Sequence, residues 1–406
     1  MCKTNRDDAA EATRTATHNV HISDRKVKVF ASEVEESTLK QARELARMPF
    51  VWPHVALDAH TGLGSSVGTV FGTKRAVIPA AVGVDIGCGM IGVLTQFTKD
   101  DLQGKDLKDL RQAIEDNIAL SPGNYNSWQL RDSANDRCRE LNALAEELGV
   151  DLSHSPKWRQ QLGSLGGGNH FIELCLDEQD RVWMFLHSGS RGVGNKIAKK
   201  HIKIAQRLCE QWWIPLPNKD LAYLVQGTPE FKAYLQDLKW AQRFAFLNRE
   251  EMMDRFADCL EEFMGQELVE LERINCHHNY TVKEKHFGHE VWLTRKGAVN
   301  AAEGRKALIP GSMGTASYVV EGKGYPGGLM SAPHGAGRRF SRTEARRRFT
   351  VDDLAARMEV IESRPGEEFI DEIPDAYKDI DVVMRDAEPL VTVLHRLRQV
   401  MNVKGT

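Results

Sequence analysis

Residues 79–90 constrain the fold most, because an apolar run there leads into a carboxylate and a thiol three residues apart. Three glycines lie between and around Asp85 and Cys88, so the backbone can turn tightly enough to aim both side chains at one point. Carboxylate and thiolate are anions that suit a divalent cation, and one thiolate can bridge two cations. The alternative is a buried cysteine that packs as a small hydrophobic residue beside an aspartate in a turn.

The composition is that of a soluble globular protein, with 41% hydrophobic and 27% charged residues among 406. A formal net charge of -3 gives no global basic field, so nucleic-acid binding would depend on a local patch. Seven cysteines form no even, paired framework, which indicates reduced thiols and a cytoplasmic location. We expect no membrane association, because the chain lacks an apolar signal core and any run of about 18 apolar residues.

Hydrophobic periodicity and the lack of a dividing linker predict one compact α+β domain. We expect this domain to have mixed β-sheets and long flanking helices around a central metal cleft. This domain is expected over residues 25–406, after a loose polar tail at residues 1–24. Helices are predicted at residues 37–48, 106–120, 132–148, 195–213, 229–265 and 376–401. Strands are predicted at residues 26–31, 170–176, 181–187, 290–293 and 317–321.

Histidines in glycine- or asparagine-flanked stretches extend the candidate metal site. His170 follows a glycine run at the start of a predicted strand, and His187 ends the next strand beside Arg191. The arginine fork suits phosphate oxygens. A histidine pair, His277 and His278, adds a fifth candidate ligand to Asp85, Cys88, His170 and His187. A single histidine of this kind is more often structural, but the joint set of O, N and S ligands suits Mn²⁺, Zn²⁺ or Co²⁺.

Two later stretches have the composition of a nucleotide site. Residues 309–317 offer small side chains, hydroxyls and free backbone N–H groups, as a phosphate-binding loop requires, although no Walker pattern is present. Residues 331–339 place His334 between proline and glycine, next to arginines. His334 is a candidate nucleophile towards phosphorus, with Arg338 neutralising the phosphate. The alternative is a loop histidine in a basic turn.

Six stretches together carry a family resemblance, at residues 84–90, 168–173, 187–192, 277–280, 310–314 and 334–338. With residues 376–381 and 403–405, they strongly resemble the RtcB family of RNA-splicing ligases, in order and spacing, from about residue 40 to the end. The resemblance implies a GTP- and Mn²⁺-dependent enzyme that joins RNA 3′-phosphate or 2′,3′-cyclic phosphate ends to 5′-hydroxyl ends. It implies a GMP-histidine and an RNA 3′-diphosphate-guanosine intermediate, in RNA repair or tRNA splicing.

Two other functions remain open at this point. One is a metal-dependent RNA-end nucleotidyltransferase or cyclic phosphodiesterase that does not complete joining. The other is a catalytically weak homologue that only binds RNA or GTP, against which the complete set of ligands and the nucleophile argue. Only analysis of the RNA end products separates a ligase from the first alternative.

The resemblance also assigns roles to individual residues. Two Mn²⁺ would be held by Asp85, Cys88, His170, His187 and His278, with Cys88 as the bridge; His278 is chosen over His277 because the family's ligand directly precedes the asparagine. His334 would carry GMP, while Arg191 and Arg338 would contact phosphate or RNA. Glu173 and Lys404 would contact the guanine base and Tyr377 would stack on it. The full GTP or GMP site would comprise Asn169, Glu173, Asn279, Pro310, Gly311, Ser312, Met313, Ser317, Gly335, Ala336, Gly337, Tyr377 and Lys404.

Three departures from the family pattern bear on this transfer. Residues 56–64 lack a usual proline and are two residues shorter, which leaves the placement of Asp58 and His60 near the metals open. Pro333 precedes the nucleophile where a small polar residue is usual, and it restricts Ala332 to extended backbone. The loop at residues 121–128 lacks the basic residues common in relatives, which bears on the choice of RNA end.

Overall fold

A computed structural model describes residues 18–22, 25–127, 130–364 and 366–405. Most of the predicted tail, residues 1–17 and 23–24, lies outside these residues, and its described part forms strand β1 (His18–Ile22). Among the described residues, no helix has the length and apolar character that crossing a membrane requires.

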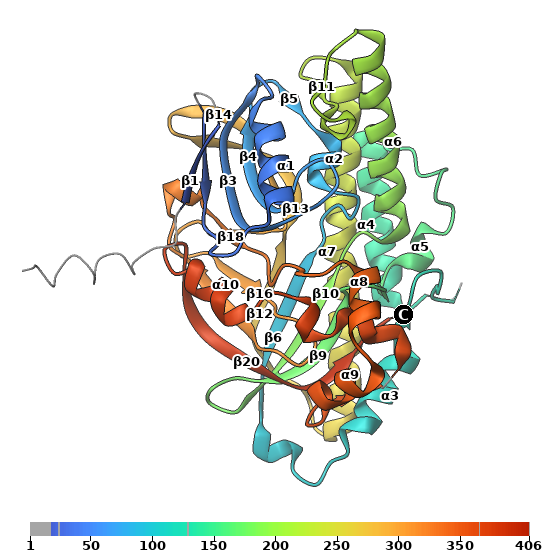
Figure 1. The fold of residues 1–406 in the computed structure, drawn as a ribbon. Helices are drawn as coiled ribbons and strands as arrows, with labels where there is room; N and C mark the ends of the chain where they lie inside the picture. Colours follow the sequence, from blue (N-terminus) through green and yellow to red (C-terminus); the bar gives the residue numbers. More distant parts are fainter. Residues whose placement is uncertain (1–17, 23–24, 128–129, 365, 406) are drawn as a thin grey trace, which may run out of the picture.

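Two β-sheets form the frame of the domain (Figure 1). The first has six strands, in the order β1, β2 (Arg25–Val29), β3 (Val51–His60), β4 (Val67–Thr73), β14 (His289–Lys296) and β13 (Asn279–His286). The second runs β12 (Glu270–His277), β6 (Gly89–Thr98), β10 (Arg181–Ser188), β9 (Phe171–Leu176), β20 (Val391–Val403), β17 (Ser317–Gly322) and β16 (Lys306–Ile309), with β19 (Glu362–Ser363) beside β20. Pairing is mostly antiparallel, but β2 with β3 and β19 with β20 are parallel, so both sheets are mixed as predicted.

Three further strand pairs are short. They are β5 (Ala76–Val77) with β11 (Leu224–Val225), β15 (Ala298–Asn300) with β18 (Ser331–Pro333), and β7 (Ala119–Leu120) with β8 (Ser164–Gly166). Because β18 is extended through Ala332 to Pro333, the backbone restriction expected before the proline is present.

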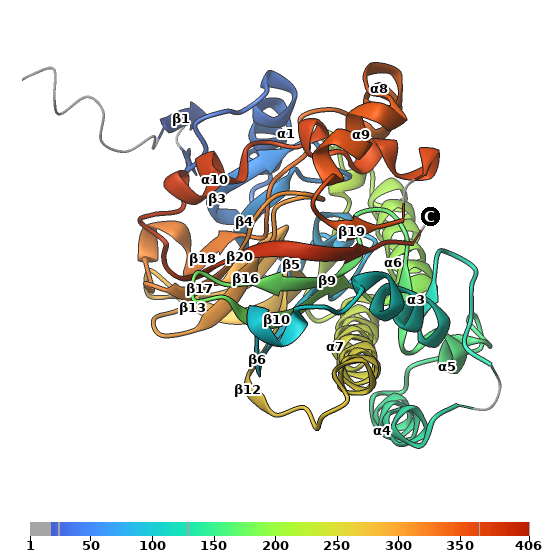
Figure 2. The same cartoon turned by 90° about the horizontal axis from the view of Figure 1, so that it is seen from below.

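Long helices cover one side of the second sheet (Figure 2). α7 (Pro229–Met264) begins at a Thr228 cap with proline in its first turn and ends at left-handed Gly265. It packs against β6 and β10 and against its neighbouring helices. The helices are α1 (Glu36–Ala46), α2 (Pro79–Val82), α3 (Leu107–Asn117), α4 (Asp132–Leu148), α5 (Trp158–Gln161), α6 (Arg191–Gln211), α7, α8 (Arg342–Arg348), α9 (Val351–Met358) and α10 (Ile380–Asp386).

Alternation along β6 gives the second sheet two buried faces. Met90 and Leu94 belong to the core cluster shared with the six-stranded sheet, whereas Ile91 and Val93 pack in the cluster that includes Met252 of α7. Successive side chains of a strand point to opposite faces, so one apolar run serves both cores. The second sheet is therefore the central layer of a single α+β domain.

The helix predicted at residues 376–401 is wrong. Only the short α10 is helical there, and the chain then enters β20, which pairs with both β9 and β17. Leu397, Gln399 and Met401 are buried with less buried residues between them, which is the period of a strand. Pro389 interrupts a helix locally, and Val391, Thr392 and Val393 favour a strand, so the prediction overlooked a signal that the sequence carries.

Candidate active site

One edge of the second sheet brings the predicted ligands together. β6 starts at Gly89 directly after Cys88, and β10 ends one residue after His187. β9 starts directly after His170, and His278 lies between β12 and β13, where the chain crosses from one sheet to the other. Antiparallel neighbours place the start of one strand beside the end of the next, so these side chains meet.

A tight turn presents Asp85 and Cys88 to this edge. Gly87 has a φ of 69°, and a Cβ there would lie 2.9 Å from the Cβ of Ala245 in α7. Only glycine fits that conformation and that contact. The turn between the short helix α2 and β6 therefore requires glycine at position 87.

The ligand atoms form two groups that share Cys88. Cys88 Sγ lies 3.4 Å from His170 Nε2 and 3.3 Å from His187 Nε2. His170 Nε2 lies 3.1 Å from Asp85 Oδ2, and His187 Nε2 lies 2.9 Å from His278 Nε2. One group is therefore Asp85, Cys88 and His170, and the other is Cys88, His187 and His278. A thiolate shared by two groups has the placement that a bridging ligand requires.

The other ring nitrogen of each histidine faces an oxygen acceptor. Nδ1–H of His170 donates to Leu165 O at 2.9 Å, that of His187 to Asn169 O at 3.2 Å, and that of His278 to the Asn279 side chain at 3.2 Å. These bonds keep the proton on Nδ1, so the Nε2 lone pairs point into the cluster. All three imidazoles are thus oriented as metal ligands.

Burial sets the charge state of the cluster. It lowers the pKa of His187 and of His278 well below the usual value for histidine, so both rings are neutral at pH 7. Burial also raises the pKa of the Cys88 thiol, and the Asp85 carboxylate raises it further. A bound cation would deprotonate that thiol, because a coordinated thiol loses its proton. The donor set therefore fits a divalent metal.

Arg191 approaches the cluster from the start of α6. Its Nη1 lies 2.9 Å from His170 Nδ1, and a Cβ on Gly166 would lie within 1.4 Å of its Nη2. The guanidinium therefore passes over a glycine that no larger residue could replace. Because a guanidinium has no acceptor, an Nδ1–H of His170 bonds to Leu165 O, and in that tautomer the contact with Arg191 is not a hydrogen bond. The predicted phosphate residue is thus beside a predicted metal ligand.

Asn248 and Arg249 of α7 hold the loops that carry the ligands, and neither was predicted from the sequence. Asn248 Oδ1 accepts from the N–H groups of Gly163 and Ser164 at 2.8 and 3.2 Å. Arg249 Nη1 donates to the carbonyls of Gly87 and Ser188 at 2.9 and 3.0 Å, next to Cys88 and His187. Both side chains are fully buried. The sequence carries no signal for either residue, because amide and charged side chains in a helix usually face solvent.

His334 lies beside the candidate metal site, here called the metal cluster, which is formed by Asp85, Cys88, His170, His187 and His278. Its ring centroid is 4.7 Å from that of His278, and its backbone N–H donates to Gly297 O at 3.2 Å. Burial lowers the pKa of His334, so the ring is neutral at pH 7. Within the described part of the chain, its buried Nδ1 has no hydrogen-bond partner. The predicted nucleophile is therefore placed against one of the predicted ligands, with an uncommitted nitrogen.

Asp58 supports the loop that carries His334. Its Oδ2 accepts from the backbone N–H of Gly337 at 2.6 Å, and its Oδ1 accepts from Lys378 Nζ at 2.8 Å. A Cβ on Gly337 would lie 2.8 Å from Asp58 and 2.9 Å from His60. The shortened stretch thus places Asp58 and His60 at the nucleophile loop.

A small cavity next to His334 gathers most of the predicted guanylate residues. Its lining comprises Asn169, Phe171, His187, Pro310, Gly311, Ser312, Met313, His334, Gly335, Ala336, Glu372, Tyr377 and Lys404. Four predicted members lie outside this lining: Glu173, Asn279, Ser317 and Gly337. Glu173 accepts from Asn402 Nδ2 at 2.9 Å, and burial raises its pKa to about 8. Asn279 Oδ1 instead accepts from Gly297 N–H at 2.9 Å, beside the nucleophile loop.

Glu372 is the centre of the polar contacts in this cavity, and it was not predicted from the sequence. Its carboxylate accepts from Tyr377 OH at 2.5 Å and lies 3.3 Å from both Lys404 Nζ and Arg338 Nη1. Burial raises the pKa of Glu372, but Lys404, Tyr377 and the arginines outweigh that effect and lower it overall. Arg338 also stands 4.8 Å above the Tyr377 ring. The tyrosine and lysine predicted to bind guanine are therefore held in place by one carboxylate.

Comparisons with known proteins find similarity over nearly the whole chain. The family model described as tRNA-splicing ligase RtcB matches residues 41–405. The RNA-splicing ligase RtcB of Escherichia coli K12 is 45% identical over 392 residues, which cover 92% of this chain and 95% of that protein. The tRNA-splicing ligases RtcB of Thermococcus kodakarensis and Pyrobaculum aerophilum are 30% and 29% identical, covering 91% and 93% of this chain and 92% and 94% of theirs.

Proposed function

The chain belongs to the RtcB family, and we propose that it is an RNA ligase that joins 3′-phosphate or 2′,3′-cyclic phosphate ends to 5′-hydroxyl ends. The observation that carries the proposal is the placement of buried, neutral His334 against His278 of the metal cluster. Phosphoryl transfer needs a nucleophile close to side chains that can hold two cations.

In the proposed reaction, a ring nitrogen of His334 attacks the α-phosphorus of GTP and pyrophosphate leaves. A 2′,3′-cyclic phosphate end is first opened by water to a 3′-phosphate with a free 2′-hydroxyl. An oxygen of the RNA 3′-phosphate then displaces His334 and takes the GMP, which gives an RNA 3′-diphosphate-guanosine end. The 5′-hydroxyl loses its proton, attacks the 3′-phosphorus and expels GMP. The low pKa of His334 supports the first step, because only a neutral ring has a lone pair to donate.

Asp85, Cys88, His170, His187 and His278 would hold two Mn²⁺, with Cys88 between them. Cations there would offset the charge on the transferring phosphorus and align its oxygens. Arg191 would add a fixed positive charge beside His170, and Arg338 would add one over Tyr377. Asp58, through Gly337, keeps the nucleophile loop at the cavity.

The guanine base is proposed to lie against Tyr377, with Lys404 and Glu173 contacting its edge. Glu372 holds both Tyr377 and Lys404, so it positions the pocket without being a predicted contact of the base. We place the reaction in RNA repair or tRNA splicing in the cytoplasm. The six cysteines among the described residues are all buried and unpaired, which fits a reducing compartment.

The test is to incubate an RNA with a 3′-phosphate and one with a 5′-hydroxyl with the protein, GTP and Mn²⁺, and to identify the ends formed. We expect a joined strand that requires GTP, is absent with His334→Ala and is retained with His289→Ala, a histidine exposed on β14. A 3′ end capped with GMP but never joined would favour the nucleotidyltransferase. Ends that are unchanged by GTP would contradict the proposal.

A further inference from the structure

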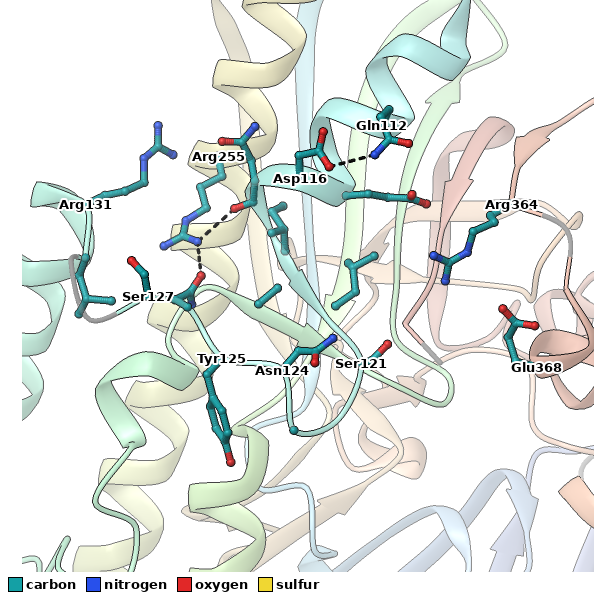
Figure 3. A pocket seen from close by; sticks show the side chains of 18 residues that line it. Gln112, Asp116, Ser121, Asn124, Tyr125, Ser127, Arg131, Arg255, Arg364 and Glu368 are labelled. Atoms are coloured by element: carbon teal, nitrogen blue, oxygen red, sulfur yellow. Dashed lines mark hydrogen bonds between the residues drawn. The ribbon is translucent and has the colours of Figure 1, made fainter.

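A cavity of about 1200 Å³, whose lining includes none of the candidate metal ligands or guanylate residues, has no role in the reaction described so far (Figure 3). It is bounded by the end of α3, strand β7, the loop at residues 121–127, the start of α4 and part of α7. Arg364 and Glu368 close it from the C-terminal part of the chain. A space of this size takes more than one nucleotide.

The cavity shares a wall with the active site. Strand β7 forms its floor and pairs in parallel with β8, whose Leu165 carbonyl accepts from the metal-ligand candidate His170. A Cβ on Gly405, directly after Lys404, would lie 1.9 Å from Gly166 O and 2.5 Å from Ser121 N. The C-terminal segment is thus wedged between the cavity loop and β8. The C-terminal segment and β8 are therefore the elements that separate the cavity from the candidate ligand His170.

The cations of the lining differ in availability. Arg131 pairs with Asp258, and Arg255 pairs with Glu251 at 2.9 Å. Arg364 makes no ion pair within the described residues, its Nε has no partner, and its guanidinium stands 5.5 Å from the centre of the Phe369 ring. Arg364 is therefore the cation of this cavity that can bind a phosphate.

Aromatic and amide groups of the loop complete the lining. Tyr125 is 44% exposed, and its ring faces Lys157 Nζ at 5.2 Å. Asn124 is exposed beside it. An exposed ring offers a stacking surface for a base, and amides can bond a ribose 2′-hydroxyl. Acidic residues also line the space, so its lining suits stacking and hydroxyl contacts more than a wholly electrostatic interaction.

We propose that this cavity binds the single-stranded nucleotides that precede the 3′-phosphate of the RNA substrate. The inference rests on the proposed function, which requires that phosphate to meet the metal cluster and the guanylated histidine. A base stacks on Tyr125, a phosphate pairs with Arg364, and the chain continues past β8 to the reacting end. The 5′-hydroxyl strand enters by another route.

Kinetics with Tyr125→Ala and Arg364→Ala test the proposal. We expect both variants to form labelled GMP-His334 normally without RNA, and to raise the KM for the 3′-phosphate strand about tenfold, given that base stacking is worth about 1–3 kcal/mol. The KM for the 5′-hydroxyl strand should not change. Trp213→Ala, at a side chain 92% exposed on another surface, and Arg139→Ala, an exposed arginine outside the lining, serve as matched controls. Tyr125→Phe should behave as the unaltered protein.

Photocrosslinking of the unaltered protein gives a result that does not depend on any variant folding. A 3′-phosphate RNA with 4-thiouridine one to three nucleotides before its end should crosslink to peptides that contain Tyr125 or Arg364. Crosslinks found only elsewhere, an unchanged KM, or a raised KM for the 5′-hydroxyl strand alone would each overturn the proposal. Failure of the proposed function is distinct, because the unaltered protein would then form no GMP-His334 or would leave the two RNA ends unjoined.

Discussion

Replacing Arg249 by methionine would test whether the loops that carry the candidate ligands need this side chain to hold them in place. Arg249 touches none of the reacting groups, but it donates to the carbonyls of Gly87 and Ser188 and to Asn275 Oδ1 at 2.8 to 3.0 Å. Methionine fills a similar volume without a donor. The change removes a charged donor from two buried carbonyls and from the part-buried amide oxygen of Asn275, while Gly87 O keeps a contact with His277 Nδ1 at 2.8 Å.

The magnitude follows from these three bonds. Each buried acceptor left unsatisfied costs about 1–3 kcal/mol. Part of that cost is offset, because burial of the guanidinium is itself unfavourable and lowers the pKa of Arg249 to about 10. We expect a net loss of about 3 kcal/mol in the free energy of unfolding. We also expect metal affinity to fall about 10- to 100-fold, because Gly87 and Ser188 adjoin two ligands.

The assay compares Arg249→Met with Arg243→Met. Arg243 also lies in α7, and its half-exposed ion pair with Glu140 of α4 is lost in that variant. Urea unfolding should show a change of about 0–1 kcal/mol for the control. A Co²⁺ titration, followed by the thiolate-to-cobalt absorption band, should show weakened binding only for Arg249→Met. If Arg249→Met loses stability but keeps the Co²⁺ affinity of the control, the reasoning about loop positioning is refuted.

Three further outcomes are expected. Burial lowers the pKa of His54 to about 4. Below about pH 6.5 the unfolded chain therefore binds more protons than the folded chain, and the free energy of unfolding should fall by about 3 kcal/mol between pH 6.5 and 4. In urea unfolding at both pH values, His54→Phe should lose this part of the pH dependence; an identical dependence would contradict it. Asp58→Asn should slow formation of GMP-histidine at least tenfold at unchanged metal content, because a neutral amide holds Gly337 N–H less firmly; an unaltered single-turnover rate would argue against this role. Cys88→Ala should reduce the bound Mn²⁺, measured by elemental analysis, from two per chain to one or none, and retention of two would exclude a bridge.

Local signals were sufficient for most elements of the fold. The start of α7 carries Thr228 and Pro229 and its end carries Gly265, so its bounds could be predicted within a residue. The pairing of strand β20 could not be predicted in this way. Pro389 and the β-branched residues 391–393 argue against a helix locally, but the partners of the strand lie 69 to 80 residues away in β17 and more than 200 away in β9.

The residues of the site also fall into two groups, those with a local sequence signal and those without one. Residues in glycine-bounded stretches, such as Cys88 and His187, stand out because flexible backbone on both sides of a ligand-type side chain is typical of a binding loop. Arg249 and Glu372 do not stand out, since charged residues in a helix or an acidic run usually face solvent. Their burial and their partners depend on tertiary packing. The convergence of the ligands at one sheet edge follows from strand order, which spacing along the chain does not reveal.

The most direct test of the central claim is the fate of α-labelled GTP. The protein is incubated with it and Mn²⁺, denatured, and the labelled residue is identified by peptide mass spectrometry. The proposed mechanism predicts GMP on His334 through a bond that is labile in acid and stable in alkali, and no label on His334→Ala. Metal-loaded protein that binds GTP yet carries no label, or carries it on another residue, would contradict the mechanism.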